Sequence, residues 1–481
     1  MKRRWPMAVG LAAVLATLGP SSGPQALEAG DDEHDADFEV WAIDQSNSPG
    51  RTFGGTLYIY RGDDLVRRPD RANAEVIDLG GAVSDLCRAQ TGADPVRPHI
   101  VSFNAAESHA IIAFVASGHV AFLDAAARTP VKCFRMSVGA GGARQAHAAF
   151  SAPDDSYVIV ANQNGKRLER INTDYSSNGF VHDTFATLDL ATCTTPNGLP
   201  CEAPGVRPDN APVCPVIDAT STVTLVTLRG GGMFVVDSSA GSALPPILAE
   251  YTMTAIHPTG CGGMQKGVSA AGKIYINAGG GSATNPLEED LYSLPAAPSA
   301  YSASNAPNVP MPVQEIPHDD AGDSHGLLLN VKRHGRYLWA GDRFLNHVRV
   351  VDTTRTPPFS LVNTFTLVSR HSADPAPDLM DIEPKGRHAF MSLRGPCPLT
   401  ANAPGVNNAV GVSPGVMVVR VKSGGLGGRV VGIARISNPG GASCPATGST
   451  EQADPHGIAV RDLSHDDEED DDDDDDDDHD D

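Results

Sequence analysis

Several features that would point to familiar redox or membrane proteins are scarce in this sequence. No sustained apolar run follows the N-terminal stretch Ala8–Leu18, so stable membrane insertion is not expected. A Cys-x-x-Cys-His haem-attachment motif and a glycine-rich dinucleotide motif are both missing. Any redox chemistry would therefore depend on a metal held by the protein's own side chains. By contrast, 49 Gly and 37 Pro residues in 481 favour many short strands joined by tight turns.

The N-terminus predicts export. A basic start, Met1–Trp5, precedes the apolar stretch Ala8–Leu18, which is too short to span a bilayer, and small residues follow to Ala29. This pattern is typical of a signal peptide over residues 1–29, so we expect a periplasmic or extracellular protein. Arg3-Arg4 leaves a twin-arginine signal open, although the residues after it match that motif poorly.

Negative charge is concentrated at one end of the chain. The formal net charge is −23, and every residue from Asp466 to Asp481 except His479 is acidic. We expect residues 464–481 to be disordered, because such a block of like charge repels itself. It also argues against a nucleic-acid partner. The tail is interpreted either as a solubilising segment or as a collector of calcium. Residues 30–38 form a second, shorter acidic segment.

One sequence template recurs along the rest of the chain. His99–Asn104, Ala110–Val115 and His119–Asp124 are three short strand-like segments that match His325–Asn330, Tyr337–Asp342 and His347–Asp352. A more polar fourth segment follows each set. Further copies can be placed over residues 147–190, 214–253, 261–318 and 378–437, which gives six complete units.

The seventh unit is divided between the two ends. Asp454–Arg461 supplies an opening strand, whereas Glu39–Asp44 and Gly55–Tyr60 supply a second and a third strand without a first. A four-stranded antiparallel sheet cannot bury both faces alone, and a ring removes the exposed ends of a stack of such sheets. We therefore predict an all-β, seven-bladed β-propeller over residues 39–463, with one blade completed by strands from both termini.

The repeats resemble a known type of propeller. Pro455–Val460, and His325-Gly326 followed by Gly335–Ala340, look like the YVTN-type repeat. This resemblance implies the architecture of the methanethiol-oxidase/selenium-binding, thiocyanate-dehydrogenase and nitrous-oxide-reductase propellers and of lactonase-like enzymes. Several of these hold copper through histidines on the channel-lining strands.

Eight cysteines in an exported chain predict disulfides, although connectivity stays open. Cys214 and Cys261 occupy equivalent positions of adjacent units, where a disulfide is favoured and copper ligation, with Met264 as an axial ligand, is the alternative. The other pairings considered are Cys193 with Cys201, Cys87 with Cys133, and Cys397 with Cys444.

Histidine recurs at the position that opens each unit. In a propeller these openings converge on the central channel, and four of the seven are histidine. Imidazole nitrogen suits copper and zinc. We predict a metal, copper above all, on His99, His147, His325 and His456, with Asp378 or Asp381 as a ligand or orienting residue. Without a metal, these histidines would only hydrogen-bond neighbouring blades. The remaining histidines, including His109 and His119, are expected to be solvent-exposed.

Arginine and lysine are expected to rim the same mouth. Arg343 and Arg394 follow second strands, and Lys266 lies near an opening; these three are the candidate catalytic residues, holding a small anion unless they form structural salt bridges.

Three functions compete. The first is a copper-dependent oxidoreductase acting on a small substrate, for which a sulfur compound is one candidate, with an unknown electron acceptor. The second is a non-catalytic binding propeller that uses its cation-binding tail or the long insert at residues 194–211. The third is a lactonase-like metal-dependent hydrolase, which is disfavoured because such sites prefer oxygen ligands.

Overall fold

The computed structural model describes residues 37–241, 243–258, 272–282, 285–329, 335–355 and 360–464. They belong to one compact unit. Residues 1–29, predicted to be a signal peptide, lie outside the described residues, as do Cys261, Met264, Lys266 and the acidic tail after Ser464, so these predictions stay open. Among the residues described, no helix combines the length and apolarity needed to cross a bilayer.

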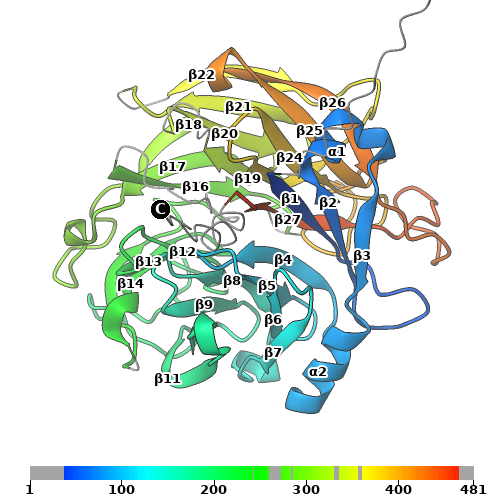
Figure 1. Cartoon of the computed structure of the whole chain (residues 1–481). Coiled ribbons are helices and arrows are strands. Elements are labelled where there is room, and N and C mark those ends of the chain that lie inside the picture. The colour runs from blue at the N-terminus through cyan, green and yellow to red at the C-terminus, as the bar shows by residue number, and fades with distance from the viewer. Residues whose placement is uncertain are drawn as a thin grey trace, which may run out of the picture. The chain divides into compact units, whose positions relative to one another are not determined.

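Seven antiparallel sheets form a ring (Figure 1). Six sheets have four strands, and the sheet of β16 has three among the described residues. This confirms the predicted seven-bladed propeller. With the strands of each blade given from the inside outward, the blades contain β27 (Pro455–Asp462), β1 (Phe38–Asp44), β2 (Thr56–Arg61) and β3 (Ala74–Asp78); β4 (Pro98–Phe103), β5 (His109–Phe114), β6 (His119–Asp124) and β7 (Pro130–Arg135); β8 (Ala146–Ser151), β9 (Tyr157–Asn162), β10 (Arg167–Asn172) and β11 (Val181–Asp189); β12 (Pro212–Ile217), β13 (Val223–Leu228), β14 (Met233–Asp237) and β15 (Ile247–Tyr251); β16 (Lys273–Gly279), β17 (Glu289–Pro295) and β18 (Val313–Asp319); β19 (Ser324–Leu329), β20 (Tyr337–Asp342), β21 (His347–Asp352) and β22 (Leu361–Thr366); and β23 (Pro377–Ile382), β24 (His388–Leu393), β25 (Gly415–Lys422) and β26 (Gly427–Arg435).

The two ends of the propeller meet in one blade. β27 pairs antiparallel with β1, with Val40 opposite Val460 and Phe38 opposite Asp462. Figure 1 shows β27 beside the blue strands β1 and β2. The C-terminal strand therefore supplies the innermost position of the blade that the N-terminal strands begin, as the divided repeat predicted.

The hydrophobic core lies between blades. Strand β5 is buried along its whole length. Its residue Ile111 packs in one cluster with Val158 and Val160 of β9 in the next blade. Each fully buried side chain of this size contributes about 1.5–3 kcal/mol. Because each sheet is covered on both faces by its neighbours, the ring as a whole is the stable unit.

Disulfides fasten several parts of the ring. Cys87 pairs with Cys133, Cys193 with Cys201, and Cys397 with Cys444, which are three of the pairings that the sequence left open. Cys214 is also disulfide-bonded, whereas Cys261, its expected partner, lies outside the described residues. The long insert is anchored as well, because Arg207 is buried with its NH2 group 2.9 Å from Glu250 Oε2 on β15.

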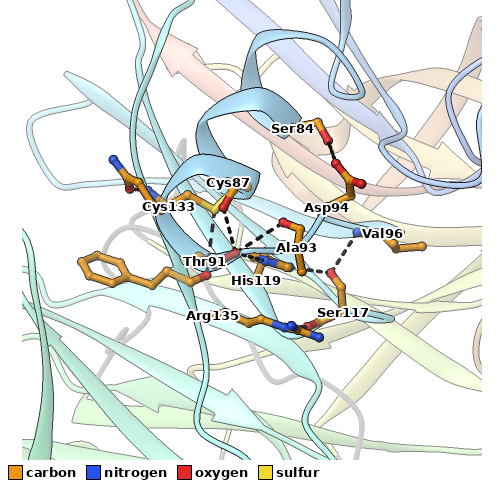
Figure 2. The surroundings of a disulfide bond; sticks show 12 residues. Ser84, Cys87, Thr91, Ala93, Asp94, Val96, Ser117, His119, Cys133 and Arg135 are labelled. Carbon is orange, nitrogen blue, oxygen red and sulfur yellow. Dashed lines mark hydrogen bonds between the residues drawn. A yellow bond between two sulfur atoms is a disulfide. The ribbon is translucent and has the colours of Figure 1, made fainter.

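A helix that the repeat template did not predict is attached to the second blade. Helix α2 (Ala82–Thr91) carries Cys87 to Cys133 on β7 (Figure 2). This bond closes a loop of 46 residues, and disulfides of this kind contribute about 2–4 kcal/mol. The shorter helix α1 (Gly62–Arg67) follows β2 directly.

His119 joins this helix to the blade (Figure 2). Its Nδ1 lies 2.9 Å from Ser117 Oγ and its Nε2 lies 2.8 Å from Thr91 Oγ1. The Thr91 hydroxyl donates to the Cys87 carbonyl, and the Val96 N–H donates to Ser117 Oγ. A neutral imidazole that accepts at Nδ1 and donates at Nε2 completes this chain. Neither His119 nor His109 is exposed, so the expectation of solvent exposure was wrong for both.

Acidification should destabilise the protein through His119. Burial lowers the pKa of His119 to about 4 from 6.5. Between pH 6.5 and pH 4, His119 binds a proton in the unfolded chain but not in the folded chain. The contribution of neutral His119 to the free energy of unfolding is therefore fully present above pH 6.5. It decreases by about 3 kcal/mol as the pH drops toward 4. Denaturant unfolding at several pH values should show a shallower pH dependence for His119→Gln, but an unchanged one for His371→Gln. Equal slopes for wild type and His119→Gln would contradict this assignment.

Candidate metal centre

The innermost strands share an irregularity that bears on the predicted site. Figure 1 shows β4, β8, β12, β19 and β27 nearest the centre of the ring. In each of these strands and in β23, the pairing with the next strand shifts register near its start. Such β-bulges re-aim side chains and are frequent beside functional sites. The shifts span the opening positions occupied by His99, His147, Cys214, His325, His456 and Asp378.

Glycine lets these strands approach closely. A Cβ atom at Gly326 would lie 2.4 Å from the Asp378 carbonyl oxygen, and one at Gly457 would lie 2.7 Å from the His99 carbonyl oxygen. Both distances are too short for a side chain. The His-Gly dipeptides at His325 and His456 therefore place an imidazole in the channel while the next residue permits contact with the neighbouring blade.

His99 and His147 form the first half of the cluster. Their Nε2 atoms lie 3.3 Å apart. His99 Nδ1 lies 2.8 Å from Gln45 Oε1, and His147 Nδ1 lies 2.8 Å from the Val213 carbonyl oxygen. The Gln45 amide has a defined orientation, because its Nε2 donates to the Asp454 carboxylate. Both Nδ1 atoms therefore face acceptors and must carry the ring proton.

His325, His456 and Asp378 form the second half. One donor atom from each lies within 4.8 Å of the others. His325 Nε2 is 3.3 Å from His456 Nε2 and 2.9 Å from Asp378 Oδ1. His456 Nδ1 lies 3.0 Å from the His99 carbonyl oxygen. The two halves adjoin, because the rings of His99 and His456 stack with centroids 3.8 Å apart.

Burial keeps the imidazoles of His99, His147 and His456 neutral. It lowers the pKa of His147 to about 4 and those of His99 and His456 well below their usual value. Burial alone would raise the pKa of Asp378, but interactions with His325, His456 and Arg394 lower it. Of these partners, Arg394 carries the permanent charge, so Asp378 remains ionised. The site thus offers neutral nitrogen donors on His99, His147 and His456 and one anionic oxygen at neutral pH.

The donor set fits a metal ion. His99 and His147 both carry their proton on Nδ1, so their Nε2 lone pairs face each other at 3.3 Å. Two lone pairs at this distance repel unless a cation lies between them, and burial opposes a proton there. Two atoms bound at about 2.0–2.1 Å to one ion lie roughly 3 Å apart. Asp378 Oδ1 lies 2.9 Å from His325 Nε2 and adds an oxygen donor to the cluster, and Nδ1–H bonds to oxygen are typical of metal-binding histidines.

Asp381, the alternative carboxylate, lies further along β23. Its Oδ2 accepts from the Val460 N–H and its Oδ1 from the Ile382 N–H. It does not belong to the group formed by His325, Asp378 and His456. Of the two acidic residues proposed as ligands, the structure brings only Asp378 to the histidines.

Arg394 and Arg343 differ in whether a guanidinium N–H group beside the cluster remains without a partner. Arg394 is fully buried, contacts both carboxylate oxygens of Asp454 at 2.6 and 2.8 Å, and donates to Asp378 Oδ2 at 2.7 Å. Arg343 pairs through Nε with Asp323. Its NH1 has no hydrogen-bond partner and lies 3.7 Å from Asp378 Oδ1. Arg343 is therefore the arginine that retains a donor beside the cluster.

Some supporting residues were not predicted. Asp323 and Asp454 each hold one of the two arginines. Both stand two positions before a channel histidine, His325 or His456, so the recurring Asp-x-His pattern could have revealed them. A second cluster of histidines and carboxylates on β17 and β18 had no counterpart in the repeats. A cavity of about 590 Å³ near Asn104 and Asp154 is lined by none of the residues predicted to bind the metal or the substrate.

Comparison with known proteins supports the architecture. No family model matches the chain, and no curated protein sequence does. Among solved structures, it is similar to a Bacteroides fragilis protein named provisionally as a 6-phosphogluconolactonase, at 10% identity and a TM-score of 0.53, with 89% of this chain and 99% of the other covered. The chain shares its propeller fold.

Two further structures agree. A protein from Lactobacillus plantarum has 10% identity and a TM-score of 0.55, with 88% of this chain and 99% of that chain covered. A hypothetical selenium-binding protein from Sulfolobus tokodaii has 10% identity and a TM-score of 0.54, with 88% and 93% covered. At such low identity the likeness establishes the fold alone, and function has to be argued from the site.

Proposed function

We propose that this protein is an exported, copper-dependent oxidoreductase acting on a small substrate at its central channel, with sulfur compounds as the first class to test. The facing lone pairs of His99 and His147 carry this proposal, since they call for a cation. Copper binds imidazole more strongly than the other divalent first-row ions do. When bound, it would supply one-electron oxidation of a substrate in an open coordination position.

The chain's own residues would orient the metal and the substrate. Gln45, the Val213 carbonyl and the His99 carbonyl fix the imidazoles through their Nδ1 atoms, which keeps each Nε2 directed at the metal. Arg343, with an unpaired NH1 beside Asp378, would hold an anionic group of the substrate. Arg394 would act through Asp378, because four of its five N–H groups are already engaged.

Export is proposed on two grounds. The basic and apolar N-terminus matches a signal peptide, and the disulfides suit an oxidising compartment. A lactonase-like hydrolase would need mainly oxygen ligands for a hard metal ion, and the channel cluster presents one carboxylate against four imidazoles. The observed donor set therefore favours the redox proposal.

Metal analysis tests the proposal directly. Protein purified without metal-affinity resin, stripped with a chelator and reloaded with copper, should retain near-stoichiometric copper after dialysis. Electron paramagnetic resonance should show nitrogen hyperfine splitting from imidazole ligands. Retained copper without such splitting would assign the metal to carboxylates, as in the acidic tail, and would contradict the channel site. Failure to retain copper would reject the proposal outright.

A further inference from the structure

A second group of metal-ligating side chains lies in the blade of β16, β17 and β18. It consists of His257, Glu288, Asp290 and His318. His257 lies in the segment after β15, Glu288 and Asp290 surround the start of β17, and His318 lies on β18. Three separate parts of the chain thus converge here, and none of these residues belongs to the channel cluster.

Local backbone structure explains the convergence. Glu288 and Asp290 are two positions apart, so they project to the same face of the extended chain. The pairing of β17 with β18 shifts register between Glu289 and Leu291, which are opposite Asp319 and Ile316. The extra residue on β18 forms a bulge next to Asp290 and brings His318 beside the carboxylates.

The donor atoms alternate around a small ring. His257 Nδ1 lies 2.8 Å from Asp290 Oδ2 and 3.4 Å from Glu288 Oε1. His318 Nδ1 lies 2.8 Å from that Glu288 oxygen and 3.1 Å from that Asp290 oxygen. Four atoms with edges of this length surround a point about 2 Å from each, which is close to the bond length of nitrogen and oxygen ligands to zinc and similar ions.

Further contacts orient the ligands as in metal sites. His318 Nε2 lies 2.9 Å from Asp320 Oδ1, so a carboxylate accepts from the ring nitrogen that faces away from the cluster. Asp290 is held at Oδ1 by the Gln314 amide at 2.7 Å and at Oδ2 by the Tyr292 hydroxyl at 3.0 Å. The carboxylates are buried, whereas the His257 and His318 side chains are 33% and 38% exposed, which leaves a route for an ion from solvent.

We propose that His257, Glu288, Asp290 and His318 bind one divalent first-row transition-metal ion of the zinc class. Two carboxylates balance the charge of such an ion, and two imidazoles select it over calcium and magnesium. The ion ties the segment after β15 to β17 and β18. This site is independent of copper in the channel, and its role is structural.

Zinc titration of the metal-stripped, full-length protein tests the site. Wild type should bind one more tight zinc ion than His257→Gln/His318→Gln, and zinc should raise the Tm of wild type more than that of the double variant. His99→Gln/His147→Gln should retain the additional zinc ion, which separates this site from the channel. His371→Gln serves as the control, since His371 lies outside both clusters. Equal zinc stoichiometry in wild type and the His257/His318 double variant would overturn the proposal and leave an internal salt-bridge network.

A milder variant keeps the test decisive if the double variant does not fold. The Asp320 side chain is 82% exposed, so Asp320→Asn should leave the fold intact. Loss of such an orienting carboxylate typically weakens metal binding by about 10- to 100-fold, and zinc affinity should fall by that factor. Unchanged zinc affinity in Asp320→Asn would count against the site, because a metal-binding imidazole depends on this partner.

Discussion

Replacing Arg394 by methionine should lower the free energy of unfolding by about 3–5 kcal/mol, the usual cost of removing one partner from a buried ion pair. Arg394, Asp378 and Asp454 all have fully buried side chains. Without the guanidinium, the buried Asp454 carboxylate would lose its ion-pair partner, and Asp378 would keep only Arg343 NH1 at 3.7 Å. Denaturant unfolding at neutral pH measures the loss.

The expected effect is large because of where Arg394 lies. It follows β24, whereas Asp454 immediately precedes β27, the strand that closes the ring. Their bidentate contact therefore joins the last complete blade to the closing strand. Arg67→Met is the matched control, since Arg67 pairs with Asp63 at the surface and such pairs contribute at most about 1 kcal/mol. Similar small losses for both variants would show that Arg394 does not support ring closure.

The ring could be predicted from sequence because it is periodic. Each blade repeats the same order of strands, and the missing strand of the N-terminal blade was visible as an unmatched segment, Asp454–Arg461. The convergence of His99, His147, His325 and His456 followed from the same periodicity. Residues that recur at one position of the innermost strand of a closed repeat must meet at the axis.

Features that break the repeat could not be predicted. Helix α2 is an insertion between β3 and β4 that has no counterpart in the other blades as far as the structure describes them. The bulges depend on contacts between neighbouring strands, and the partners of Arg394 depend on long-range packing. The ligands proposed for zinc, including His257 and His318, occupy no recurring position, so only the folded chain brings them together. The prediction of exposure failed for His119 because α2 covers it.

Replacing His147 by glutamine should change stability in opposite directions with and without copper. In the metal-free protein, the bare Nε2 atoms of His99 and His147 face each other at 3.3 Å. A glutamine amide could donate to His99 instead, which adds one hydrogen bond and removes the repulsion between the two lone pairs, whereas the Nδ1–H bond to the Val213 carbonyl is lost. The metal-free variant should therefore be more stable than wild type by up to about 1 kcal/mol.

With copper at about 100 times its Kd, the order should reverse. Wild type gains about 2.7 kcal/mol from a bound ion at this concentration, whereas the variant lacks a ligand and should gain much less. Denaturant unfolding with and without copper gives both values, and His371→Gln should match wild type in each. A variant that is less stable than wild type without metal, yet equally stabilised by copper, would show that His147 only hydrogen-bonds its neighbours. The reversal is specific to a metal site. The two facing Nε2 lone pairs repel each other when no cation lies between them, and both bind the cation when one is present.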